Sequence, residues 1–216
     1  MDVQQAYNLW AQQYDINENK TRDLEARALR EMLADYSFTH CLEIGCGTGK
    51  NSAWLITQAG KITAVDISEE MLLKAKMKIN SDRIQFLLAD ITMDWDLPSK
   101  AYDLVTFSLV LEHIENLDHI FGEVSRVLCE DGHVYIGELH PYKQYAGSKA
   151  RFETEEGVQV VNCYNHNISD FVRSAKTHGL ELLLLEEYFD EDQPTAIPRI
   201  LGLVFRKRSP LSNSYK

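Results

Sequence analysis

The chain has 216 residues, of which 44% are hydrophobic and 25% are charged, as expected of one globular domain. Its formal net charge of −11 argues against a nucleic-acid binder, because such proteins neutralise phosphates with lysine and arginine. The same charge argues against a polybasic membrane anchor. The four cysteines form no CxxC pair, so a reducing, cytoplasmic compartment is expected and a zinc site is not.

No segment is predicted to span a membrane, because no apolar run approaches about 20 residues. The run from Leu180 to Leu185 is far too short, and Glu181 interrupts it. The first residues carry neither the basic nor the apolar region of a signal peptide, so none is expected.

Two helices are predicted at the N-terminus, and they form a helical cap over residues 1–36. Apolar residues recur at near-helical spacing in residues 2–14. Residues 15–20 are expected to form a loop. Thr21 is expected to cap a second helix that runs to about Tyr36.

Strands and helices then alternate, which predicts an α/β domain. The first strand is expected at Phe38–Ile44, and after three glycines a helix runs from Lys50 to Ala59 and is closed by Gly60. Ser68 is expected to cap the next helix, another helix is expected at Leu117–Leu128, and a turn at Asp131-Gly132 leads into the fifth strand. The further strands of this region are predicted at Lys61–Asp66, Ile84–Leu88, Tyr102–Phe107 and His133–Glu138.

The pattern breaks after the fifth strand. Residues 140–166 are expected to form an insertion, with a small hairpin around Glu155-Glu156-Gly157. A helix at Ile168–His178 is stopped by Gly179. The last two strands are predicted at Leu180–Tyr188 and Arg199–Arg206, and residues 208–216 are expected to form a frayed tail.

The strand–glycine–helix stretch from Leu42 to Lys50 predicts a site for a polar ligand, because glycines allow a close approach and a helix N-terminus offers free N–H groups. The alternative is a plain tight turn. A nicotinamide oxidoreductase needs G-x-G-x-x-G, but the glycines stand at 45, 47 and 49, with Lys50 at the third glycine position. That spacing disfavours a dinucleotide.

The sequence E-x-G-C-G-T-G from Glu43 to Gly49 resembles motif I of the class I S-adenosylmethionine-dependent methyltransferases. The resemblance extends over roughly residues 36–140. It implies a single Rossmann-like domain with a seven-stranded, mostly parallel sheet, an antiparallel last strand and helices on both faces. It also implies S-adenosylmethionine as the cofactor and S-adenosylhomocysteine as its product.

Polar groups at the ends of the predicted strands match the parts of this cofactor. Asp66 can accept hydrogen bonds from ribose hydroxyls, and Asp90 can accept one from the adenine amino group. Acidic groups also suit a cationic cofactor. With the resemblance, the expected cofactor-binding residues are Tyr14, Glu43, Gly45, Cys46, Gly47, Gly49, Asp66, Ile67, Met71, Asp90, Ile91 and Ser108.

Three histidines are candidates for a base that takes a proton from the methyl acceptor: His113, His140 and His166. His113 ends a Leu-x-His sequence that resembles the one after the fourth strand of many small-molecule methyltransferases. His140 is favoured, because it follows the fifth strand and opens the insertion, which is predicted to be an acceptor lid. Phe152 and four tyrosines are expected to line the acceptor pocket: Tyr7, Tyr142, Tyr145 and Tyr164.

The acceptor is expected to be a small molecule that is methylated on oxygen or nitrogen. After the fourth strand the chain has Ser108-Leu109-Val110-Leu111 and not the (D/N)-P-P-(Y/F) of enzymes that methylate flipped bases. A Pro-Cys pair is absent as well, and no acidic cluster has the spacing of metal ligands. The alternative is a non-catalytic cofactor-binding partner or sensor of the same fold. A monomer or homodimer is expected, with no nucleic-acid or membrane partner.

Overall fold

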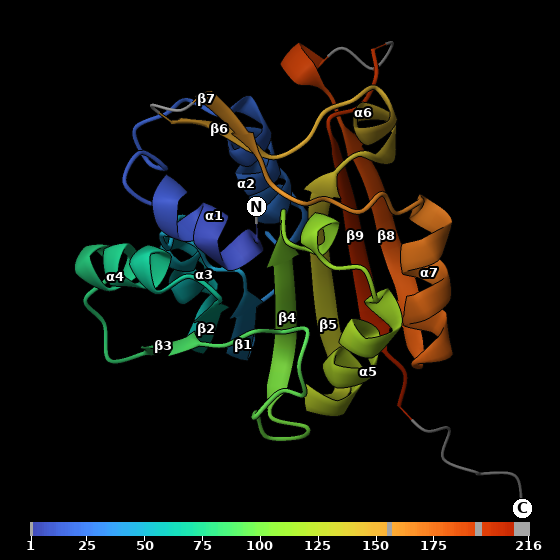
Figure 1. The fold of residues 1–216 in the computed structure, drawn as a ribbon. Helices are drawn as coiled ribbons and strands as arrows, with labels where there is room; N and C mark the ends of the chain where they lie inside the picture. The colour runs from blue at the N-terminus through green and yellow to red at the C-terminus, as the bar shows by residue number, and fades with distance from the viewer. Residues whose placement is uncertain (1, 155–156, 193–195, 210–216) are drawn as a thin grey trace, which may run out of the picture.

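The computed structural model describes residues 2–154, 157–192 and 196–209. One sheet of seven strands forms its centre, in the order β3-β2-β1-β4-β5-β9-β8 (Figure 1). The strands are β1 (Phe38–Ile44), β2 (Ala59–Asp66), β3 (Ile84–Leu88), β4 (Tyr102–Ser108), β5 (Leu128–Leu139), β8 (Leu180–Tyr188) and β9 (Ile200–Lys207). β9 runs in the opposite direction to the other strands of this sheet, so the predicted sheet and its antiparallel last strand are confirmed.

Helices cover both faces of the sheet. They are α1 (Val3–Trp10), α2 (Lys20–Met32), α3 (Ser52–Gln58), α4 (Glu69–Lys78), α5 (Leu117–Val127), α6 (Pro141–Tyr145) and α7 (Ile168–Thr177), with short 3₁₀ helices η1 (Leu111–His113) and η2 (Asp190–Asp192). The two faces bury separate cores because successive side chains of a strand point to opposite sides. Leu42 and Ile44 of β1 pack with the core of α5 and α7, whereas Cys41 packs with that of α2 and α3.

A second, two-stranded sheet is formed by β6 (Arg151–Thr154) and β7 (Gly157–Val160). The hairpin predicted in the insertion is therefore present, although Glu155 and Glu156 of that prediction lie outside the described residues. Its Phe152 stacks on Trp10 of α1, with ring centroids 5.2 Å apart. Together α1 and the hairpin form a roof above the carboxyl ends of β1 and β4 (Figure 1).

Several predicted boundaries differ from the structure. Asn19, and not Thr21, caps α2, because its extended backbone lets its side chain accept hydrogen bonds from the N–H groups of Thr21 and Arg22. The helix ends at Met32 and not near Tyr36. Gly60 lies inside β2 and does not close α3.

The fifth strand begins at Leu128, five residues before the predicted start. Leu128 pairs with Tyr102, and the register with β4 then shifts before His133 pairs with Leu104. Asp131, at a φ of +60°, lies within this irregular stretch, so the expected turn is a bulge inside the strand. By contrast, Gly179 stops α7 with a φ of +78°, as predicted. Most of the predicted tail, residues 210–216, lies outside the described residues.

Candidate active site

The three glycines of the loop after β1 all have positive φ, but they serve different purposes. A Cβ on Gly45 would lie 2.2 Å from Cγ2 of Val110, and one on Gly49 would lie 2.9 Å from Cδ1 of Ile79. These two glycines allow close packing. A Cβ on Gly47 would meet only the ring of Tyr14, at 4.0 Å. The backbone at Gly47 therefore borders open space, which is where a ligand can approach.

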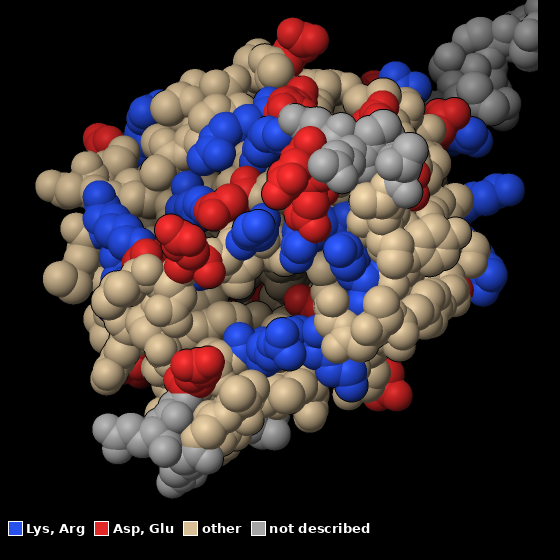
Figure 2. Space-filling view, turned by 90° about the horizontal axis from the view of Figure 1, so that it is seen from above, with Lys and Arg blue, Asp and Glu red and all other residues tan. Residues whose placement is uncertain are grey.

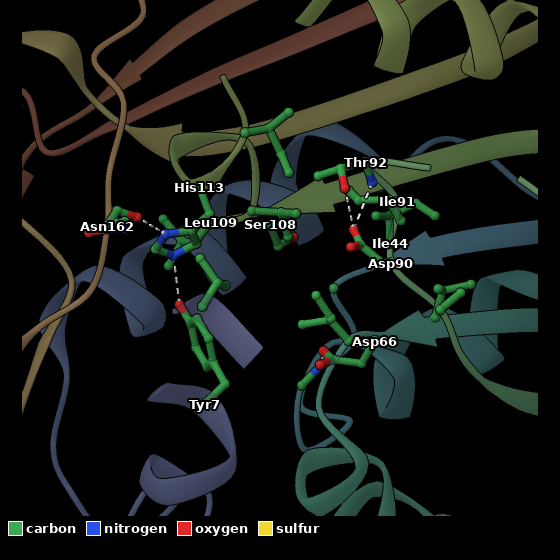
Figure 3. A pocket seen from close by; sticks show the side chains of 18 of the residues that line it. Tyr7, Ile44, Asp66, Asp90, Ile91, Thr92, Ser108, Leu109, His113 and Asn162 are labelled. Carbon is green, nitrogen blue, oxygen red and sulfur yellow. Dashed lines mark hydrogen bonds between the residues drawn. The ribbon is translucent and has the colours of Figure 1, made fainter. Parts of the chain in front are cut away.

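That open space is a cavity of about 300 Å³ at the carboxyl ends of β1, β2 and β4. Asp66 and Asp90 lie on one side of it, and Tyr7, His113 and Asn162 lie on the other (Figure 3). Open α/β sheets bind their ligands at this edge. The predicted residues that line the cavity are Tyr7, Tyr14, Gly45, Gly47, Asp66, Ile67, Asp90, Ile91, Ser108, His113 and Tyr164.

Asp66 is fixed by two backbone hydrogen bonds. Its Oδ2 accepts from the N–H of Gly47 at 2.7 Å, and its Oδ1 accepts from the N–H of Ser68 at 2.8 Å. Each carboxylate oxygen retains a free lone pair, so the group can still accept hydrogen bonds from a ligand in the cavity. Burial raises the pKa of Asp66, and these backbone hydrogen bonds oppose the shift.

Asp90 is exposed and uses Oδ1 to accept hydrogen bonds from the backbone N–H and the hydroxyl of Thr92. No hydrogen bond within the described residues engages its Oδ2. Asp90 and Asp66 therefore leave acceptor capacity at two neighbouring strand ends, on the same side of the cavity (Figure 3).

The opposite side of the cavity holds a hydrogen-bonded pair from distant parts of the chain. The hydroxyl of Tyr7 lies 2.8 Å from Nε2 of His113, and Nδ1 of His113 lies 2.8 Å from the carbonyl oxygen of Asn162 (Figure 3). A carbonyl only accepts, so Nδ1 carries the ring proton and Nε2 presents a lone pair to Tyr7. Burial lowers the pKa of His113, which keeps this neutral form at neutral pH.

Glu138, at the end of β5, holds the segment that carries His113. Its buried carboxylate accepts hydrogen bonds from the backbone N–H groups of Val110, Leu111 and Glu112, at 2.9, 2.8 and 3.4 Å. The N–H of Leu109, which has a φ of +58°, donates to the carbonyl of Gly137 at 2.8 Å. Glu138 was not among the predicted site residues, although a carboxyl residue near the end of a predicted buried strand was a signal for it.

Four predicted cofactor residues do not line the cavity. Glu43, Cys46, Gly49 and Met71 are buried behind it. Glu43 accepts a hydrogen bond from the hydroxyl of Ser52 at 2.5 Å, which ties β1 to the start of α3. Burial raises the pKa of Glu43 to about 8, and the bond from Ser52 opposes that shift. In the structure these residues support the loop from behind.

His140, the base favoured from the sequence, also lies outside the cavity lining. It is fully buried at the start of α6. Its Nδ1 accepts from the N–H of Tyr142 at 3.2 Å, which leaves Nε2 to donate to Glu187 at 2.9 Å. Both ring nitrogens are therefore occupied, as in a residue that fixes the end of β5 to β8.

Of the remaining predicted residues of the insertion, one lines the cavity and the others lie outside its lining. His166 contacts the carbonyl of Ile114 through Nε2, at 2.7 Å, and is not in the cavity lining. Tyr142 and Tyr145 are each 58% exposed, and Tyr145 bonds to Asn167. Tyr164 does line the cavity. Within the described ranges, no group of three His, Cys, Asp or Glu side chains is placed to hold a metal ion.

Comparison with known proteins finds a family model and relatives that this chain resembles. Residues 42–136 match a family model described as a methyltransferase domain. A demethylmenaquinone methyltransferase of Leptospira interrogans is 30% identical over 142 residues, which cover 60% of this chain and 57% of that protein. Over residues 42–136, this chain is similar to methyltransferase domains. It spans little more than half the length of the curated relatives it matches first.

Solved structures share the fold of this chain. An S-adenosylmethionine-dependent methyltransferase from Mesorhizobium loti aligns with a TM-score of 0.73 at 21% identity, over 85% of this chain and 98% of that one. The structure of the DhpI–SAH complex aligns with a TM-score of 0.74 at 21% identity, over 94% of each chain. In the described part of this chain, no helix is long and apolar enough to cross a membrane.

Because burial raises the pKa of Glu43, we expect the free energy of unfolding to depend on pH. Its pKa of about 8 in the folded state lies above the ordinary value of 4.5, so the folded protein keeps a proton that the unfolded chain releases between these values. The free energy of unfolding should therefore fall as pH rises from about 4.5 to 8. Glu43→Gln should flatten this decline, as measured by urea unfolding at several pH values. Parallel curves for the two proteins would contradict the assignment.

Proposed function

We propose that the chain is an S-adenosylmethionine-dependent methyltransferase that transfers the methyl group to an oxygen or nitrogen of a small molecule. The observation that carries this proposal is the cavity in which the glycine loop and two strand-end aspartates face the Tyr7–His113 pair. The family match and the named methyltransferases among the relatives support it.

The cavity fits the cofactor in shape and chemistry. Gly47 leaves room for a close approach, Asp66 can accept hydrogen bonds from ribose hydroxyls, and Asp90 can accept one from the adenine amino group. Ile67 and Ile91 supply apolar surface for the adenine ring, and Ser108 borders the inner end. The acidic side of the cavity suits a cation.

When bound, S-adenosylmethionine supplies an electrophilic methyl group on a sulfonium, with a neutral thioether as the leaving group. The chain then has to align the acceptor, exclude water and accept a proton. His113 is the best-placed base, because its ring is neutral and its Nε2 accepts the hydrogen bond of the Tyr7 hydroxyl, which also lines the cavity. Tyr7 stays protonated, since burial raises its pKa well above 10, and its hydroxyl can relay a proton to His113.

The covering of the cavity by α1 and the β6–β7 hairpin favours a small acceptor. The α1 helix and the β6–β7 hairpin cover the carboxyl edge of the sheet through the Trp10–Phe152 stack. The N–H of Tyr164 donates to the carbonyl of Glu112 at 2.7 Å, so the end of the insertion is fastened beside His113. We propose residues 140–166 as the acceptor lid. A covered site favours a small molecule over a macromolecule.

A side chain at Gly47 should block cofactor binding by occupying the space beside Tyr14. We expect Gly47→Val to weaken S-adenosylhomocysteine binding by about tenfold or more in calorimetry, with an unchanged circular dichroism spectrum. The matched control is Gly179→Val, because Gly179 also has positive φ, lies at the end of α7 and would have no atom within 4 Å of an added Cβ. Equal losses in both variants would mean that the effect is backbone strain alone.

Loss of the base should slow turnover without weakening cofactor binding. With isotope-labelled cofactor and a pool of small metabolites, the wild type should form S-adenosylhomocysteine and a methylated product. His113→Ala should lower kcat about 10²- to 10⁴-fold, the usual contribution of a general base. Its affinity for S-adenosylhomocysteine should stay within about twofold.

His140→Ala is the comparison variant, since His140 lies outside the cavity lining. It should lower thermal stability more than kcat. If the wild type consumes no cofactor with any acceptor fraction, the binding-only alternative replaces the proposed enzyme. If His140→Ala and not His113→Ala lowers kcat, the base is misassigned.

A further inference from the structure

A second cavity lies beside the first, on the far side of Tyr7. Its volume is about 260 Å³, at the small end of the range for small-molecule sites. Tyr7, Tyr14 and Leu109 line both cavities, so these residues form the boundary between them. A molecule in the second cavity would therefore lie directly next to a ligand in the first.

Cationic side chains surround this second cavity, although the chain carries a net charge of −11. The lining includes Arg22, Lys149, Arg151 and Arg199. Figure 2, which views this face from above, shows lysine and arginine side chains around the mouth of a hollow with an acidic group inside it. The local charge thus opposes the charge of the whole protein.

Most of these cations are not neutralised by the protein. Arg199 is paired with Asp190 through two hydrogen bonds. Arg22 instead donates to backbone carbonyls and lies 4.0 Å above the ring of Tyr14, while its buried Nε has no partner in the described part of the chain. Lys149 and Arg151 are exposed, and no described carboxylate pairs with them. No described carboxylate therefore forms an ion pair with Arg22, Lys149 or Arg151.

The inner end of this cavity has the opposite character. Glu112 lines it and is only 6% exposed. Burial raises the pKa of Glu112 to about 7, and the side chains of Cys163 and Gln144 oppose that shift, but no described residue forms a well-aligned hydrogen bond with its Oε2. Its Oε1 lies 3.9 Å from Nε2 of His113. A buried carboxyl oxygen without a partner is costly, so a hydrogen-bond donor on a ligand would stabilise it. The side chain is close to the proposed base and next to the shared Tyr7.

We propose that the second cavity binds the methyl acceptor, and that this acceptor is a small organic anion with a hydroxyl or amine at its other end. Its carboxylate or phosphate contacts Arg22, Lys149 and Arg151, and its donor group points to Glu112 and Tyr7. This inference rests on the proposed function. A cationic acceptor would be repelled by the same three side chains.

The cofactor, the acceptor and the Tyr7–His113 pair account for every bond and proton in the reaction. A lone pair of the acceptor oxygen or nitrogen forms the bond to the methyl carbon. The carbon–sulfur bond breaks, and its electron pair stays on sulfur as the neutral thioether. The acceptor proton passes through the Tyr7 hydroxyl to Nε2 of His113, which completes the step without a further reactant.

Matched pairs of probes test the charge preference. Calorimetry would compare para-hydroxybenzoate with para-hydroxybenzamide and lactate with lactamide, with and without saturating S-adenosylhomocysteine. Each anion should bind more tightly than its uncharged partner. Benzoate, which has no hydroxyl donor for Glu112, should bind several-fold more weakly than para-hydroxybenzoate.

The double variant Lys149→Ala/Arg151→Ala should weaken binding of the anions by about tenfold or more. Its affinity for the uncharged partners and for S-adenosylhomocysteine should not change. The control Arg173→Ala/Lys176→Ala removes the same charges from exposed positions of α7 and should change nothing. The inference is wrong if no anion binds, if uncharged partners bind as well, or if the control loses equally. If S-adenosylhomocysteine does not bind, the proposed function is wrong. The anion titrations without S-adenosylhomocysteine do not depend on that result, so the two failures can be told apart.

Discussion

The carboxylate of Glu138 accepts hydrogen bonds from three consecutive N–H groups, and both sides of the site depend on this arrangement. It holds Val110 against Gly45, which fixes the position of the glycine loop next to β4. It also fixes η1, so that His113 reaches Tyr7 on the roof. Burial raises the pKa of Glu138 to about 8, whereas the three hydrogen bonds favour its ionised form. One buried group thus fixes both the glycine loop and the segment that carries His113.

The residues that line the two cavities differ in charge. Asp66 and Asp90 give the first cavity an acidic side, which suits a cationic cofactor, while Lys149 and Arg151 give the second a basic mouth. Tyr7 separates them and bonds to the neutral His113. Methyl transfer needs alignment and exclusion of water more than it needs strong acid–base chemistry. A roof fastened by the Trp10–Phe152 stack over two adjoining cavities meets those needs.

The features that could be predicted from the sequence are those that depend on neighbouring residues in the chain, such as strand bounds. The bounds of β1 and β3 agree with the structure, because short apolar strands between glycine or polar turns leave little choice of register. Asp66 could be placed at the cavity because a strand-end residue follows from the strand itself. Tyr7 and His113 were each named from the sequence, but their hydrogen bond was not predicted, since they are 106 positions apart and meet only through the fold. His140 was favoured from its place after β5, but position on a strand does not reveal that both ring nitrogens are occupied.

The central claim is that the first cavity binds S-adenosylmethionine through Asp66. Calorimetric titration of S-adenosylhomocysteine into the wild type and into Asp66→Ala tests it most directly, with the exposed Asp82→Ala as the control. Loss of charge-assisted hydrogen bonds should weaken binding about 10- to 100-fold, or roughly 1.4–2.8 kcal/mol, in Asp66→Ala alone. Circular dichroism should show that this variant remains folded. Unchanged affinity in a folded Asp66→Ala variant would contradict the account.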